Sequence, residues 1–276
     1  MMNAAKPNAL PIGVFDSGVG GLTVLKALRD ELPHEDLIYL GDTARLPYGT
    51  KSPASISRYA SQATRQLQRQ GIKLLVVACN TASAVALDEL RQQMATLPVI
   101  GVVEPGATAA VNARPQSTHL VLATEATVRL GAYRRAILDI DPGSEVKELA
   151  CELLVSLAEE GWSNGPIGEA ILRRYLGELD ESARQPDSVI LGCTHFPLLS
   201  DVFTSVFGSA VSIVDSASTT AVVARERLES MALGNAQTAP GTLRLLATDG
   251  ATRFARVGGL FLGQHLSAAD VTIVDL

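Results

Sequence analysis

Apolar residues along this chain gather in short runs that alternate with longer segments of helical periodicity. Two of the runs, LLVVA and SVIL, are apolar throughout, which is typical of parallel strands covered on both faces. Between the runs, segments 21–31, 54–70, 82–94 and 166–177 repeat their apolar positions at helical spacing. This strand–helix alternation predicts a doubly wound α/β fold. The expected strands are residues 11–15, 36–40, 73–78, 99–103, 119–123, 145–149, 188–191, 211–214, 243–247 and 271–274.

Length and composition narrow the class of protein. A chain of 276 residues can form one large α/β domain or two smaller ones, and periodicity alone leaves both open. The formal charge of −6 lacks the basic excess of a nucleic-acid-binding surface. Three cysteines without a C-x-x-C pair are typical of free thiols in a reducing compartment. No apolar run of signal-peptide or membrane-spanning length is present, so we expect a cytoplasmic protein whose first ten residues form a tail.

Two cysteines occupy matching places at the ends of apolar strands. In KLLVVACNTAS, Cys79 follows a small residue at the strand end and precedes polar residues and a predicted helix. In SVILGCTHFPLL, Cys193 has a similar setting. Ligands of open α/β sheets bind outside the carboxyl ends of the strands, so both thiols are expected at the functional edge. The helix start next to Cys79 should favour its thiolate, because unpaired N–H groups stabilise negative charge.

Other roles stay open for these cysteines. A lone cysteine at a strand end is usually a small buried hydrophobe, and Cys151, without polar neighbours of this sort immediately after it, is interpreted in that way. A metal site formed by Cys79, Cys193 and His195 is a further alternative, although it lacks the paired spacing of structural zinc and needs another ligand. The matching contexts of the two thiols favour acid–base chemistry instead, and we predict no metal.

The first predicted strand is also followed by polar residues. The segment GVFDSGVGGLT places Asp16 and Ser17 before three glycines that permit a tight turn into a helix. Thr23 stands where a dinucleotide-binding G-x-G-x-x-G motif has its third glycine, and the lysine of a P-loop is absent. The turn is therefore expected to offer backbone N–H groups to a small anion such as a carboxylate. Capping of the helix by Asp16 is the structural alternative.

Two further loops follow predicted strands. The segment YLGDTARLPYGTKS contains the turn signal Pro47-Tyr48-Gly49, and LATEATV supplies Thr124 and Thr127. Each loop alone is weak evidence for a site. Their shared position after a strand predicts that they lie at the same edge as the cysteines.

Together these residues resemble the glutamate racemases. The combination of DSG-x-GG with CNT and GCTH is specific to that family, whereas either fragment alone is shared with the wider aspartate/glutamate racemase superfamily. A C-terminal segment, TDGATRFARVGGLFLG, is also similar to the family's last segment. The matching stretches are residues 13–22, 46–50, 77–82, 101–107, 122–128 and 191–198.

The resemblance implies a cytoplasmic isomerase that interconverts L- and D-glutamate without pyridoxal phosphate, metal or nucleotide. D-glutamate of this origin feeds the synthesis of peptidoglycan precursors. The implied fold is two doubly wound α/β domains of similar topology with the active site in the cleft between them. On this chain the domains map to residues 1–99 with 211–276, and to residues 100–210. The expected partner is the small-molecule substrate, with no nucleic acid and no membrane, and a homodimer stays open.

The resemblance also implies roles for residues at matching motif positions. Cys79 and Cys193 are the two acid–base groups, the first working on the D-enantiomer and the second on the L-enantiomer. Asp16 assists the first thiol and His195 the second. Two thiols in opposite protonation states suit racemisation, because a proton leaves one face of the α-carbon and another arrives on the opposite face. The implied substrate contacts are Asp16, Ser17, Pro47, Tyr48, Gly49, Asn80, Thr81, Thr124, Thr127, Thr194 and His195.

One segment departs from the family pattern. Where the family often has C-P-x-x-V-P-L, residues 151–157 read CELLVSL and lack both prolines. The assisting acidic residue of some members maps to Glu159, but the adjacent Glu160 stays an alternative.

Other functions also stay open from the sequence. They are a racemase of aspartate or another acidic amino acid, a one-thiol decarboxylase or isomerase of a small dicarboxylic acid, and a non-catalytic binding protein for acidic amino acids. Chirality-resolved assays separate the first from a glutamate racemase, and the mass of the product identifies a decarboxylase. Alkylation of the thiols that glutamate protects against would argue against the binding protein.

Overall fold

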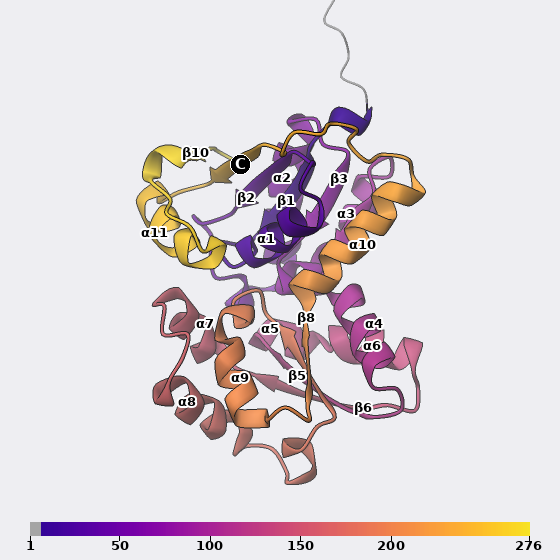
Figure 1. The fold of residues 1–276 in the computed structure, drawn as a ribbon, viewed down its shortest axis with the longest axis vertical. Coiled ribbons are helices and arrows are strands. Elements are labelled where there is room, and N and C mark those ends of the chain that lie inside the picture. Colours follow the sequence, from indigo (N-terminus) through magenta and orange to yellow (C-terminus); the bar gives the residue numbers. More distant parts are fainter. Residues whose placement is uncertain (1–6) are drawn as a thin grey trace, which may run out of the picture.

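Parallel strands form two separate sheets in the computed structural model, which describes residues 7–276 apart from the side chain of Ser182 (Figure 1). The first sheet has the order β10-β9-β2-β1-β3-β4 and the second the order β6-β5-β7-β8. All the predicted strands are present, and the α/β prediction is confirmed. The first sheet contains β1 (Ile12–Asp16), β2 (Leu37–Gly41), β3 (Leu74–Val77), β4 (Val99–Gly101), β9 (Leu243–Ala247) and β10 (Val271–Ile273). The second contains β5 (Thr118–Ala123), β6 (Glu145–Ala150), β7 (Ser188–Gly192) and β8 (Ser212–Asp215).

Strands that are buried along their whole length form the centre of each sheet. Every residue of β1, β3 and β7 is buried. Helices cover both faces of a parallel sheet, so both sides of these strands meet apolar neighbours and no alternation is needed. Neighbouring strands run in the same direction, for example β1 beside β3 with Ile12 opposite Leu74, and their carboxyl ends therefore meet at one edge.

The predicted amphipathic segments form helices with identifiable starts. At the start of α2, the side chain of Ser52 accepts a hydrogen bond from the backbone of Ser55, and Pro53 occupies the first turn. No helix among residues 7–276 is both long and apolar enough to span a membrane. The α-helices are α1 (Leu22–Glu31), α2 (Pro53–Arg69), α3 (Asn80–Gln93), α4 (Val103–Ala113), α5 (Glu125–Leu130), α6 (Ala132–Ile140), α7 (Glu152–Glu159), α8 (Pro166–Leu176), α9 (Ser200–Phe207), α10 (Ser216–Ser230) and α11 (Ala251–Leu262).

Short 3₁₀ helices complete the described chain. Of the expected N-terminal tail, residues 1–6 lie outside the described residues, and Pro7–Ala9 forms a 3₁₀ turn. The others are η2 (Tyr48–Thr50), η3 (Ser182–Arg184), η4 (Phe196–Leu199) and η5 (Ala268–Asp270).

The chain passes from the first sheet to the second after β4 and returns after β8. The first sheet with the helices packed on it is called the first half below, and the second sheet with its helices the second half. On the return, the side chain of Asp215 accepts hydrogen bonds from the first turn of α10, which packs against α1 of the first half and α4 of the second. Figure 1 shows α10 running back along the half that contains β1, β2 and β3. The expected domain limits, 99/100 and 210/211, differ slightly from the strand pairing. β4 pairs in the first sheet to Gly101, and β8 pairs in the second sheet to Asp215.

Candidate active site

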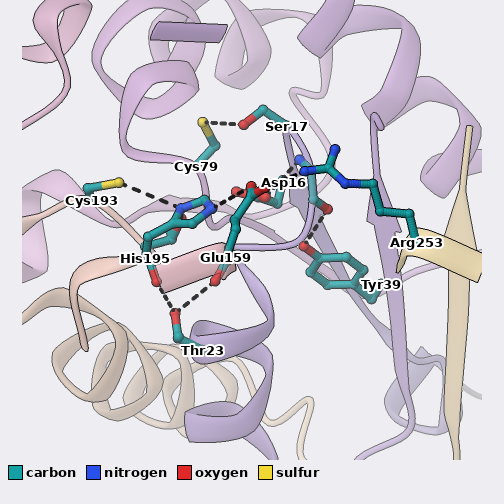
Figure 2. A network of polar contacts seen from close by, with 12 residues as sticks. Asp16, Ser17, Thr23, Tyr39, Cys79, Glu159, Cys193, His195 and Arg253 are labelled. Atoms are coloured by element: carbon teal, nitrogen blue, oxygen red, sulfur yellow. Dashed lines mark hydrogen bonds and ion pairs between the residues drawn. The ribbon is translucent and has the colours of Figure 1, made fainter. Parts of the chain in front are cut away.

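The two cysteines lie just beyond the carboxyl ends of central strands, one in each sheet. Cys79 follows β3 and Cys193 follows β7, and each residue is 5% exposed. Burial and the Asp16 carboxyl are the main causes of the raised pKa of Cys79, and a thiolate at Cys193 would raise it further. Figure 2 shows both beside the same group of polar side chains. The strand-end positions predicted for these thiols are therefore observed, and two separate sheets supply them.

Cys79 is held mainly in its thiol form. Its Sγ donates a hydrogen bond to Ser17 Oγ at 3.3 Å and accepts one from the backbone N–H of Ala82 at 3.4 Å. Burial and the nearby Asp16 carboxyl raise the pKa of Cys79 to about 12. The Ala82 N–H does lower the pKa of Cys79, as expected of a helix start, but the net shift is upward and the thiolate is not the favoured form. The helix does begin at Asn80, but loss of hydration outweighs its N–H groups.

Asp16 ends β1 and is buried beneath the glycine turn. Its Oδ2 accepts a hydrogen bond from Gly18 N–H at 2.8 Å, whereas Oδ1 is buried without a partner among the described residues. Burial raises the pKa of this carboxyl, and the Gly18 N–H and the His195 ring only partly oppose that shift. Asp16 does not cap α1, because the cap position is Gly21 and has no side-chain bond. A raised pKa makes a buried carboxyl better able to take up and return a proton.

Two of the glycines after Asp16, Gly20 and Gly21, are required for space rather than for turn conformation, whereas a Cβ on Gly18 would lie at an ordinary 3.4 Å from Leu46 Cδ2. None of Gly18, Gly20 and Gly21 has the positive φ for which glycine is usually needed. The expectation that these glycines permit the backbone conformation of the turn is therefore wrong. A Cβ atom on Gly20 would instead lie 2.5 Å from His195 Nδ1 and closer still to Thr194 Oγ1. The turn of the first half thus touches the cysteine loop of the second half, and only a residue without a side chain fits.

His195 connects Cys193 to an acidic residue. Its Nδ1 lies 3.7 Å from Cys193 Sγ, and its Nε2 lies 3.1 Å from Glu159 Oε1 (Figure 2). Burial lowers the pKa of His195, but the hydrogen bonds to Cys193 and Glu159 outweigh it and raise the pKa to about 10. The hydrogen bond with His195 in turn lowers the pKa of Glu159. Glu160 is exposed, so Glu159 is the one of the two adjacent glutamates that faces the imidazole.

The proline-free segment after Cys151 supports this arrangement. Residues Glu152–Glu159 form α7, which ends with Glu159 facing His195. Glu159 Oε2 also pairs with Arg253 Nη2 at 2.6 Å, from α11 of the first half. Cys151 itself is fully buried in the apolar core, as predicted.

Three threonine hydroxyls meet between the halves. Thr81 Oγ1, on α3, lies 2.9 Å from Thr124 Oγ1 and 3.5 Å from Thr127 Oγ1. Thr124 and Thr127, around α5 of the second half, lie 3.0 Å from each other. The structure therefore brings these three predicted contacts together as a cluster of hydroxyl donors and acceptors.

The predicted proline–tyrosine–glycine turn divides into different roles. The Tyr48 hydroxyl donates to Asp42 Oδ2 at 2.5 Å, and its ring is buried in the core. Gly49 faces the second half, because a Cβ there would lie 3.3 Å from Thr124 Cβ. Pro47 is exposed. Hence the Tyr48 side chain anchors the turn in the first half, and Gly49 borders the second half.

Several connecting residues were not predicted. The Thr23 hydroxyl lies 3.0 Å from Gly20 O and 2.9 Å from Thr194 O, and so links the glycine turn to the cysteine loop of the other half. The Tyr39 hydroxyl donates to Gly18 O at 2.9 Å (Figure 2). Of these residues only Thr23 stood out in the sequence, as the residue that breaks the dinucleotide-binding motif.

The alternative metal site finds no support, since no group of three or more His, Cys, Asp or Glu among residues 7–276 is placed to hold an ion.

Comparison with known proteins places this geometry in a family. The family described as Asp/Glu/Hydantoin racemase matches residues 22–224. The chain is 48% identical to a glutamate racemase of Geobacter metallireducens over 96% of both chains. Glutamate racemase of Thermus thermophilus, solved with β-chloro-D-alanine, superposes with a TM-score of 0.87 at 41% identity, covering 98% of this chain and 99% of that one. The Francisella tularensis glutamate racemase solved with D-glutamate gives 0.88 at 36% identity, covering 97% and 98%. With this similarity over nearly its whole length, the chain belongs to the glutamate racemase family.

Proposed function

We propose that this protein interconverts L- and D-glutamate by moving a proton across the α-carbon between Cys79 and Cys193. One observation carries the proposal: two buried thiols follow equivalent strands of the two sheets, and each adjoins a titratable side chain of its own. Asp16 and Ser17 adjoin Cys79, while His195 and Glu159 adjoin Cys193. Family membership supports glutamate as the substrate, because the full-length relatives at 40–48% identity are named glutamate racemases.

The protonation of the thiols gives the reaction its direction. For L-glutamate, the Cys193 thiolate removes the α-proton while the Cys79 thiol delivers a proton to the opposite face. The raised pKa of Cys79 suits it to be the donor. After one turnover Cys79 is the thiolate and Cys193 the thiol, which is the state required for D-glutamate. Asp16 and His195 then return protons to and from the thiols, so that either enantiomer can react again.

Preorganised donors must stabilise the carbanion, since the α-carbon is a very weak acid. We propose that the hydroxyls of Thr81, Thr124 and Thr127 contribute to carboxylate binding, since they converge from both halves. The other proposed substrate contacts are Asp16, Ser17, Pro47, Tyr48, Gly49, Asn80, Thr194 and His195. With the two protons accounted for by thiols, we propose a reaction independent of pyridoxal phosphate, metal and nucleotide.

Solvent deuterium at the α-carbon tests the two-thiol mechanism. The wild-type enzyme should exchange the α-proton of both glutamate enantiomers and racemise both. Cys79→Ser and Cys193→Ser should each abolish racemisation. Cys151→Ala is the matched control, because this cysteine is buried in the core and bonds only to a backbone carbonyl. Near wild-type racemisation by either serine variant would overturn the mechanism. Faster turnover of aspartate than of glutamate would favour the aspartate racemase instead.

The cellular role and the assembly follow as further proposals. We propose that the enzyme works in the cytoplasm and supplies D-glutamate for peptidoglycan. We also propose a homodimer that covers the exposed Trp162 and Leu260 side chains, which are 54% and 47% exposed. A Cβ on Gly161, the residue before Trp162, would lie 3.4 Å from Leu260 Cδ1. Sedimentation equilibrium should show a dimer that Trp162→Ser with Leu260→Ser weakens, and a monomer at every concentration would exclude it.

A further inference from the structure

The side-chain amide of Asn80 is satisfied on one side only. Asn80 is the first residue of α3, directly after Cys79, and is 3% exposed. Its Oδ1 accepts a hydrogen bond from the Tyr133 hydroxyl at 2.7 Å, whereas Nδ2 is buried without a partner among the described residues. A buried N–H donor without an acceptor is costly, so this amide is prepared for an acceptor from outside the protein.

Tyr133 contacts both halves of the site. It lies on α6 of the second half and is fully buried. A Cβ on Gly192, the residue before Cys193, would lie 3.0 Å from Tyr133 Cε2. A single side chain therefore packs beneath the strand end that carries Cys193 and bonds to the residue next to Cys79. Proton transfer between the two thiols does not itself involve this contact.

The direction of the hydrogen bond determines the orientation of the amide. Burial raises the pKa of Tyr133 well above its ordinary value, although a hydrogen bond with the Ser216 side chain partly opposes the shift. The phenol therefore keeps a proton, which it donates to Asn80 Oδ1. An O–H donor at Asn80 requires the carbonyl oxygen to face Tyr133. Both N–H groups of Nδ2 must then point away from the phenol, and without the hydroxyl either orientation of the amide becomes accessible.

We propose that Tyr133 is a positioning residue for racemisation: it holds the Asn80 amide so that Nδ2 donates to a carboxylate of the bound amino acid. This inference rests on the proposed function, because it takes the carboxylate of glutamate as the missing acceptor. It adds a residue of the second half that orients a substrate donor of the first half.

A double-mutant cycle tests the inference. Tyr133→Phe removes one oxygen atom and should lower kcat/KM for both enantiomers by about 10- to 100-fold, mainly through KM, because a carboxylate is bound before and during proton transfer. Asn80→Ala should cost at least as much. If Tyr133 acts through Asn80, adding Tyr133→Phe to Asn80→Ala should change kcat/KM little further. A merely structural role would give additive losses.

Two more variants separate positioning from folding. Tyr175→Phe is the matched control, because its hydroxyl bonds to the backbone of Leu153, and it should keep wild-type kcat/KM. Asn80→Asp keeps an acceptor for Tyr133 but lacks the N–H donors, so it should be as impaired as Asn80→Ala even if Tyr133→Phe fails to fold. Additive losses, or an active Asn80→Asp, would overturn the inference alone. A wild-type protein that does not racemise glutamate would overturn the proposed function and this inference with it.

Discussion

The close approach of the glycine turn to the cysteine loop predicts a large effect of one methyl group. In Gly20→Ala the new Cβ would lie 2.5 Å from His195 Nδ1 and closer to Thr194 Oγ1. Ordinary contacts between such atoms are about 3.5 Å or more, so the side chains of Thr194 and His195, or the loop that carries them, must move by roughly 1 Å. The loop backbone is held to the turn by the Thr23 hydroxyl, which lies within hydrogen-bond distance of Gly20 O and Thr194 O, so the His195 ring must take up part of the movement.

The size of the effect follows from where the displacement falls. His195 adjoins Cys193, and a displacement of about 1 Å at a reacting group can lower the rate by about 100-fold. Overpacking at a buried contact costs about 1–3 kcal/mol in the free energy of unfolding. We therefore expect Gly20→Ala to lose about two orders of magnitude in kcat/KM. At the same time, it should stay folded at 25 °C.

The assay is racemisation followed by circular dichroism from each enantiomer, with urea unfolding measured on the same samples. Gly234→Ala is the matched control, because Gly234 is exposed, has no positive φ and has no atoms near the new Cβ. It should match the wild type in both measurements. If Gly20→Ala kept wild-type kcat/KM, the turn would not press against His195 during catalysis, and the reasoning would be refuted.

Two further predictions concern ionised groups. Glu159→Gln removes the charge that helps to raise the pKa of His195 to about 10. The basic limb of the pH profile of kcat/KM should therefore move to lower pH. A limb that does not move would contradict a role for the His195–Glu159 pair. Lys73 and Glu35 form a buried ion pair, with side chains 1% and 4% exposed. Lys73→Met would leave the buried Glu35 carboxylate without its cation, so the free energy of unfolding measured in urea should fall by about 3–5 kcal/mol. The exposed Lys26 provides the control, where the same change should cost less than about 1 kcal/mol.

The strands and the edge of the site could be predicted because they depend on local pattern. Runs such as LLVVA are buried on both faces, and polar residues directly after them must lie at the carboxyl edge of a sheet. This placed Cys79 and Cys193 at equivalent strand ends. It failed for the charge state of Cys79, because a helix start is visible in the sequence whereas burial and the carboxyl of Asp16, from another strand, are not.

Residues that connect the two halves could not be found in this way. Apolar periodicity, read in a window of about 11–18 residues, shows which side chains of an element are buried. It does not show which distant residue each of them contacts. Thr23 and Thr194 are 171 positions apart, and Asn80 and Tyr133 are 53 apart. Each reactive group is thus placed by its own strand, whereas the distance between the groups depends on contacts across the junction. Substitutions at the junction should therefore affect the proton transfer more than the stability of either sheet, since the central strands keep their neighbours when the halves shift.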